Sequence, residues 1–173
     1  IAFSMYLIRY MVVLPFLQES QAASALSGFQ FNLLTLAVVL VAAGGYVINN
    51  FYDTGIDALN KPGSNPVGTL IPRKMSLLLY MLLTLGGIVA AILFGESTGI
   101  RYAVLVVGMA AGLLYFYSSS YKKMLLAGNI IIALLAALNI FITILFDKTA
   151  LLSMAVLSVV TAYTIFAFLL TLS

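Results

Sequence analysis

The sequence LLTLAVVLVAAGGYVI (residues 33–48) runs directly into NNFYDTGIDALNKP (residues 49–62), so a long apolar segment ends in a polar cluster. The apolar segment predicts a membrane-spanning helix, because backbone polar groups in lipid must be satisfied within the segment. The polar cluster holds Asp53 and Asp57, two of only five carboxylates in the chain. A carboxylate costs roughly 2.5–3.5 kcal/mol at the centre of a membrane helix. We therefore expect both to face a bundle interior where a cation or another partner compensates them.

Helical spacing brings the cluster onto one face of the predicted helix. At about 100° per residue, Asn49, Asn50, Asp53 and Asp57 fall within an arc of about 100°. Carboxylate and amide oxygens are the ligands that hard cations prefer. The spacing predicts an oxygen-lined cation site. Two plainer interpretations remain: the carboxylates could contact interfacial water, and the amides could satisfy backbone groups at a helix end.

Composition sets the protein class. The chain has 173 residues, of which 64% are hydrophobic and 8% charged, and its mean hydropathy is +1.17. These values predict an integral membrane protein with an all-α, polytopic helix bundle of about six spans. The scattered net charge of +3 argues against a nucleic-acid partner. Since the chain contains no cysteine and no histidine, thiolate and imidazole chemistry is excluded.

The predicted spans form one transmembrane domain over residues 1–173, which we expect to be incomplete at both ends. Their apolar runs lie at about 1–17, 31–51, 75–95, 101–118, 124–146 and 150–172. Polar loops are expected at 18–30 and 52–74. The spacing Gly108-x-x-x-Gly112 and the pair Gly86-Gly87 predict close helix approach, most simply for packing.

The basic residues predict the orientation. Loops after the second and fourth runs carry Lys61, Arg73, Lys74, Lys122 and Lys123, whereas the opposite loops carry Arg101 and Lys148. By the positive-inside rule, the polar cluster faces the cytoplasm. We expect the protein to lie in a bacterial or archaeal cell membrane. Arg9 lies within the first run, and we expect it either to snorkel to the interface or to line a cavity.

Two motifs resemble one family. The string NNFYDTGID (49–57) with NKP (60–62) resembles the NDxxDxxxD…N(R/K)P signature of UbiA-type intramembrane prenyltransferases. The string YSSSYK (117–122), followed by Gly128-Asn129, is similar to the Tyr-to-Lys turn of that family. The resemblance covers residues 44–134, and it implies that about six spans of an eight- or nine-helix bundle are visible.

The resemblance implies an enzyme that moves a polyprenyl group from an allylic prenyl diphosphate to a lipid or aromatic acceptor, with Mg²⁺ as cofactor. It implies metal binding by Asn49, Asp53 and Asp57, and catalytic roles for Asp53, Asp57, Tyr117 and Lys122. It implies substrate binding by Asn49, Lys61, Arg73, Lys122 and Asn129. Tyr115 and Tyr117 cannot share a helical face, and we expect the Tyr117 ring to face the allylic cation. Beyond the substrates, the expected partners are membrane lipids.

The chain departs from the family pattern in three places. Asn50 stands where the signature has an acid, and Gly55 replaces a frequent third acid. No acid follows Asp147, although the family carries a second Asp-rich motif after its sixth helix. We therefore expect that motif beyond Ser173.

The sequence leaves alternatives open for the acceptor substrate and for the functional class of the protein. Residues 60–68 (NKPGSNPVG) look most like the geranylgeranylglycerol-phosphate geranylgeranyltransferase subgroup, with quinone-pathway aromatic prenyltransfer as the alternative. A CDP-alcohol phosphotransferase would need a DG-x-x-A-R string, which is absent. A cation-coupled transporter or a non-enzymatic membrane scaffold could also carry such a cluster.

Overall fold

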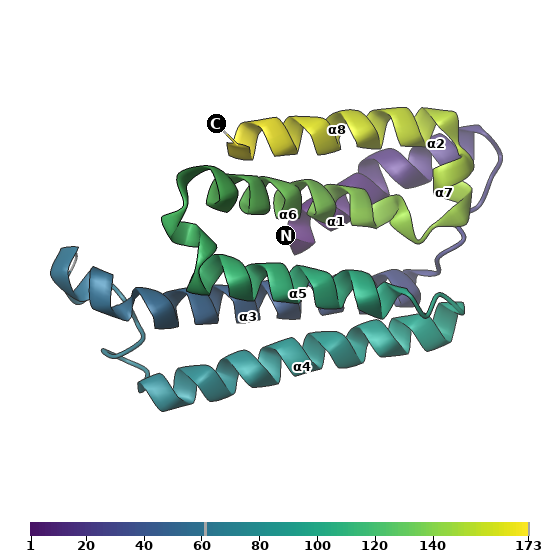
Figure 1. Cartoon of the computed structure of the whole chain (residues 1–173). Coiled ribbons are helices and arrows are strands. Elements are labelled where there is room, and N and C mark those ends of the chain that lie inside the picture. Colours follow the sequence, from purple (N-terminus) through teal and green to yellow (C-terminus); the bar gives the residue numbers. More distant parts are fainter. Residues whose placement is uncertain (61, 173) are drawn as a thin grey trace.

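The computed structural model, which describes residues 1–60 and 62–172, folds each predicted apolar run into a helix (Figure 1). The first run forms α1 (Ala2–Ile8), a π-helical segment (Arg9–Val13) and α2 (Leu14–Glu19). The later runs form α3 (Gly28–Asn60), α4 (Arg73–Thr98), α5 (Ala103–Ser119), α6 (Leu125–Leu145) and α8 (Met154–Leu172). A 3₁₀ turn (Tyr121–Lys123) and the short α7 (Lys148–Leu152) lie in connections. The predicted all-α, polytopic bundle is confirmed.

Length and composition make these helices membrane segments. Within the described residues, α3, α4, α6 and α8 are long and apolar enough to cross a membrane, and α5 is a shorter apolar helix. A chain with this many apolar helices is an integral membrane protein.

Helix α3 runs further than the sequence predicted. We expected a loop from residue 52, but α3 continues to Asn60. Side chains support this extension, because Asn49 Nδ2 donates to Asp53 Oδ2 at 3.0 Å and Thr54 Oγ1 donates to the Phe51 carbonyl at 2.6 Å. The helix ends shortly before Pro62, as proline cannot continue it. The acidic cluster is therefore held on a rigid helix.

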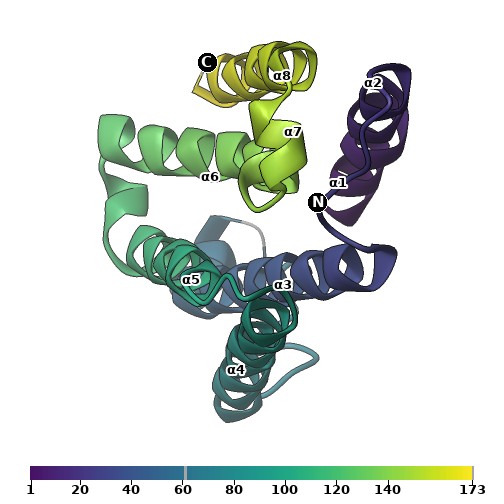
Figure 2. The same ribbon diagram turned by 90° about the vertical axis from the view of Figure 1, so that its right-hand side faces the viewer.

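Glycines set the packing of α3. The helix lies along α4 and also contacts α5, while α6 packs against α8 (Figure 2). A methyl group on Gly87 of α4 would lie 2.7 Å from Val41 Cγ2 and 2.9 Å from the Ala37 carbonyl oxygen of α3. On α3, a methyl group at Gly44 would lie 2.6 Å from Thr84 Oγ1. These glycines let the two backbones approach closely.

The predicted close approach at Gly108 and Gly112 is wrong. Of the atoms in the described residues, a methyl group on Gly112 would meet none within 4 Å, and one on Gly108 would meet only Ile88 Cδ1 at 3.8 Å. Of the predicted Gly86-Gly87 pair, Gly87 makes the tight contact. The motif fixes the spacing of two glycines on one helix face, but not which face meets a neighbour.

A buried polar network closes the end of the bundle opposite the acidic cluster. The fully buried carboxylate of Asp147 accepts hydrogen bonds from Ser24 Oγ at 2.5 Å and from the Ala25 backbone N–H at 3.0 Å. It also caps α7 by accepting from the Ala150 N–H at 3.1 Å. The network joins the α2–α3 loop to the α6–α7 turn.

Arg9 neither snorkels nor lines a cavity, the two alternatives that we expected. Its side chain is buried, and Nη2 donates to the Leu26 carbonyl at 2.7 Å. The guanidinium carbon lies 4.4 Å from the centre of the Phe31 ring, which makes a cation–π contact. Among the described residues, Nε and Nη1 have no hydrogen-bond partner, so the Leu26 carbonyl and the Phe31 ring compensate this charge only in part.

The connections alternate between the two ends as the charge pattern predicted. The α3–α4 loop and the α5–α6 turn share one end of the bundle, and the α4–α5 and α6–α7 connections share the other (Figure 1). The two sequence motifs thus reach the same end.

The glycine contacts lead to a matched comparison of two substitutions. We expect Gly87→Ala to lower the free energy of unfolding by about 1–3 kcal/mol, because its methyl group must push α3 away. Gly112→Ala has open space and should change it by less than about 1 kcal/mol. Denaturation with a titrated detergent would measure both. Equal effects would contradict the assigned α3–α4 contact.

Candidate active site at the end of helix α3

Two motifs that are distant in the sequence meet at the end of α3. Lys122 Nζ, from the 3₁₀ turn, donates to Asn49 Oδ1 at 3.3 Å and forms an ion pair with the Asp53 carboxylate. The Asp53 side chain is 14% exposed and the Lys122 side chain is 38% exposed, so the pair is partly shielded from solvent. Asn49, Asp53 and Lys122 form one polar cluster, as the motifs predicted.

The turn that carries Lys122 depends on Gly128. A methyl group on Gly128 would lie 2.9 Å from the Tyr121 carbonyl oxygen and 3.5 Å from Tyr117 Cε2. Glycine thus allows the first turns of α6 to pack against the α5–α6 connection. The Tyr117 ring, from the last turn of α5, lies at this contact, and Lys122 lies in the 3₁₀ turn that follows α5.

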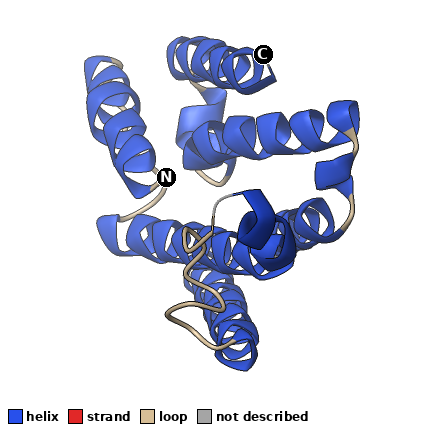
Figure 3. Ribbon diagram, turned by 90° about the vertical axis from the view of Figure 1, so that its left-hand side faces the viewer, coloured by secondary structure: helices blue, strands red, loops and turns tan. Residues whose placement is uncertain are grey.

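Asp57 has a different partner from Asp53. Its Oδ2 accepts a hydrogen bond from Asn65 Nδ2 at 2.8 Å, and Asn65 belongs to the α3–α4 loop. Both residues line a small cavity of about 140 Å³ beneath that loop. Figure 3 views the bundle from this end and shows the loop beside the last turns of α3. The two carboxylates are therefore held from two sides.

Three residues of the predicted region have other contacts. The Asn50 amide donates to the Tyr46 carbonyl at 3.0 Å, which agrees with the plainer interpretation of a backbone-satisfying amide. The Arg73 guanidinium lies 4.7 Å from the centre of the Phe51 ring. The Tyr115 hydroxyl accepts from the Tyr52 hydroxyl at 3.3 Å.

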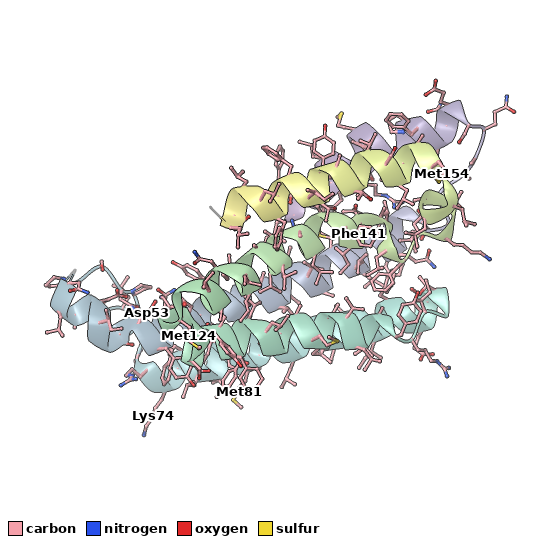
Figure 4. All side chains as sticks on the ribbon, turned by 45° about the horizontal axis from the view of Figure 1, so that its top comes forward. Asp53, Lys74, Met81, Met124, Phe141 and Met154 are labelled. Atoms are coloured by element: carbon pink, nitrogen blue, oxygen red, sulfur yellow. The ribbon has the colours of Figure 1, made fainter. Side chains whose placement is uncertain are left out.

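The remaining predicted residues lie at the edge of the site. Asn129 has an exposed side chain in the first turns of α6. Lys61 lies outside the described residues. Figure 4 shows Asp53 and Met124 at the same end of the bundle, and Lys74 projecting outward from it.

An apolar cavity of about 420 Å³ lies between the helices. Its lining comes mainly from α3, α5 and α6, and includes Val41, Leu114 and Ile132. Among the described residues that line it, Asn139 alone is polar. Asn139 Nδ2 donates to Ser4 Oγ at 2.8 Å, a hydrogen bond that joins α6 to α1. The cavity suits a long hydrocarbon group.

The polar cluster has the chemistry of a cation site. Asn49 Oδ1 and the Asp53 carboxylate, one helical turn apart, both contact the Lys122 ammonium group, so these oxygens already converge on one positive charge. Asp57 adds a second carboxylate one turn further along α3. Oxygen donors of this kind fit a hard divalent cation such as Mg²⁺.

Sequence reasoning gave no role to Asn65, which is buried at the centre of the α3–α4 loop. A local signal was present, because Asn65 precedes Pro66 and an Asn-Pro pair favours a turn. Its Oδ1 accepts from the Val67 N–H at 2.9 Å, which is the hydrogen bond of an Asx turn. That signal predicts the turn but not the contact with Asp57.

Comparison with known proteins finds relatives that share one name. The chain is 38% identical to digeranylgeranylglyceryl phosphate synthase of Hyperthermus butylicus over 148 residues, 84% of this chain and 47% of that protein. It is 38% identical over 111 residues to the protein of the same name from Sulfurisphaera tokodaii, covering 63% of this chain and 37% of the relative. It is 35% identical over 133 residues to the protein of the same name from Saccharolobus solfataricus, covering 75% of this chain and 43% of the relative. The chain is a homologue of the digeranylgeranylglyceryl phosphate synthases.

These relatives confirm the resemblance to UbiA-type prenyltransferases. The chain spans less than half the length of each of these synthases. No family model matches it. No solved structure matches it either.

For this synthase homologue, the Asp53–Lys122 contact can be measured with a double-mutant cycle. We expect Asp53→Asn and Lys122→Met to be non-additive by about 1 kcal/mol in the free energy of unfolding, because either change removes the same ion pair. The exposed Glu96–Arg101 pair at the opposite end should show a coupling near zero. Full additivity at Asp53 and Lys122 would contradict the contact.

Proposed function

We propose that this chain contains the diphosphate-activating site of an intramembrane prenyltransferase. The observation that carries the proposal is the meeting of Asn49, Asp53 and Lys122 at one end of an apolar helix bundle. A diphosphate needs a positive charge to hold it, and its counter-cation needs oxygen ligands. This cluster contains both. The names of the relatives support the same activity.

Mg²⁺ is the cofactor that we propose for this site. Asn49, Asp53 and Asp57 would hold the ion through their side-chain oxygens. When bound, Mg²⁺ supplies Lewis-acid stabilisation of the negative charge on a leaving diphosphate. The two carboxylates and one amide give a set of hard oxygen donors, which Mg²⁺ prefers together with phosphate oxygens and water.

The proposed reaction is an alkyl transfer to oxygen. The bond between the allylic C1 and the diphosphate oxygen breaks, and the diphosphate leaves with the electron pair. A bond forms between C1 and the acceptor hydroxyl oxygen, and the hydroxyl proton is released. Lys122 would hold the departing diphosphate, with Lys61, Arg73 and Asn129 as further substrate-binding candidates, and the Tyr117 ring would face the allylic cation.

The apolar cavity would hold the prenyl chain. Its lining residues come from the middle of α3, α5 and α6, at membrane depth relative to the polar cluster. A hydrocarbon wall both binds the chain and keeps water from the cation. The lining is almost entirely apolar, which supports this assignment.

A glycerol phosphate lipid is the acceptor that we propose. The relatives are named for a product with two geranylgeranyl groups on glyceryl phosphate, so the last transfer to that product requires a singly substituted acceptor. None of the relatives quoted above is named for an aromatic acceptor, and this favours the lipid over a quinone-pathway ring. The ion-paired cluster and the adjacent apolar cavity favour an enzyme over a scaffold or a transporter fragment.

We also propose that the site faces the cytoplasm. The α3–α4 loop and the α5–α6 turn carry the excess of basic residues, and short basic loops stay on the cytoplasmic side. A donor made by soluble enzymes could then reach the site without crossing the membrane.

Removal of the central carboxylate tests the proposed site. In the full-length protein, we expect Asp53→Ala to abolish Mg²⁺-dependent release of diphosphate from geranylgeranyl diphosphate in the presence of a glyceryl phosphate lipid acceptor. Glu96→Ala, which removes a carboxylate at the opposite end, should leave the rate within twofold of the unaltered protein. Unchanged turnover in Asp53→Ala would refute the site assignment.

Lys122 should affect metal and substrate binding in opposite directions. Lys122→Met leaves the Asp53 charge uncompensated, so Mg²⁺ alone should bind several-fold more tightly. The same change removes a diphosphate contact, so a non-reactive geranylgeranyl diphosphate analogue should bind about tenfold more weakly. Calorimetric titration would measure both affinities, with Lys148→Met as the control. A change of both affinities in the same direction would contradict the proposed double role.

A further inference from the structure

Asn65 is a buried polar residue in the α3–α4 loop, with 6% of its surface exposed. Its side chain takes part in three hydrogen bonds. Nδ2 donates to Asp57 Oδ2 at 2.8 Å and to the Asn50 carbonyl at 2.9 Å. Oδ1 accepts from the Val67 N–H at 2.9 Å. These bonds require a side chain that donates through nitrogen and accepts through oxygen. Aspartate has no donor and leucine has neither group, so neither could replace Asn65.

The loop is shaped to bring this amide back to α3. Gly63 and Gly68 have φ angles of +80° and +92°, a conformation that residues with a Cβ rarely adopt. The Asn65 carbonyl accepts from Thr69 Oγ1 at 2.6 Å, which closes the loop on itself. The loop therefore presents a fixed donor to the last turns of α3.

The donor restricts the carboxylate that the proposed site needs. A free aspartate at a helix end exchanges rotamers, but a charge-assisted hydrogen bond from a buried amide holds it in one orientation. The bond is made to Oδ2 of Asp57, and no described residue donates a hydrogen bond to Oδ1, so this second oxygen can face a ligand. Residues that orient a ligating carboxylate in this way typically change metal affinity 10- to 100-fold when removed.

We propose that Asn65 is a positioning residue, which acts through Asp57 to prepare the cation site on α3. The inference rests on the proposed function, since it takes Asp57 as a metal ligand. It explains why a polar side chain is buried in a loop that could have been closed by apolar residues. It also makes the loop part of the site, although Asn65 itself touches no substrate.

The test uses the full-length protein and measures the Mg²⁺ concentration that gives half of the maximal thermal stabilisation, without turnover. We expect Asn65→Leu, which keeps the branched four-atom skeleton but removes the donor, to raise this concentration at least tenfold. Thr69→Val is the matched control, because it removes a hydrogen bond of the same loop without touching Asp57. It should stay within twofold of the unaltered protein.

Repeating the measurement in an Asp57→Asn protein distinguishes an effect through Asp57 from a general loss of loop structure. If Asn65 acts through Asp57, Asn65→Leu should have no further effect on the Mg²⁺ midpoint in an Asp57→Asn protein. Equal shifts in Asn65→Leu and Thr69→Val would overturn the proposal, as would an additive shift in the Asp57→Asn background. An Asp57→Asn protein with an unchanged midpoint would instead refute the metal assignment itself. A changed midpoint in Asp57→Asn with none in Asn65→Leu would refute the positioning role alone.

Discussion

Helix α3 is longer than the membrane that it crosses, and this excess length organises the candidate site. Its 33 residues extend for about 50 Å at ~1.5 Å per residue, whereas the hydrocarbon core of a bilayer is about 30 Å thick. The final turns must therefore project towards the aqueous side. An α-helix satisfies its own backbone there, so its side chains are free to bind. Asn49, Asp53 and Asp57 occupy that projecting part.

Support for the projecting turns comes from two separate segments. The α5–α6 turn brings a cation to Asp53, and the α3–α4 loop brings an amide donor to Asp57. Each segment is held by a glycine-dependent contact or turn, at Gly128 and at Gly63 and Gly68. The site is thus a rigid helix with two short connections folded onto it, in a bundle whose interior remains apolar.

The sequence predicted those features that depend on periodicity and composition. The apolar runs and the shared face of Asn49 and Asp53 follow from composition and spacing. The meeting of Lys122 with the acidic cluster was implied by the resemblance of the two motifs to the UbiA-type family. Features that depend on which faces meet were not predictable. Gly112 has the same spacing as a packing motif but faces open space, whereas Gly44 received no prediction and packs tightly. Asn65 and Arg9 find partners through tertiary contacts, which no local pattern specifies.

The buried Asp147 network has a consequence for biogenesis. Its carboxylate lies more than 120 residues along the chain from the Ser24 hydroxyl and Ala25 N–H that it accepts from. Membrane helices can insert individually before they assemble, so the α2–α3 loop leaves the translocation machinery long before its acceptor is synthesised. During that interval these donors must rely on water at the membrane surface. Insertion and closure of this bundle are therefore distinct events, with Asp147 completing the second.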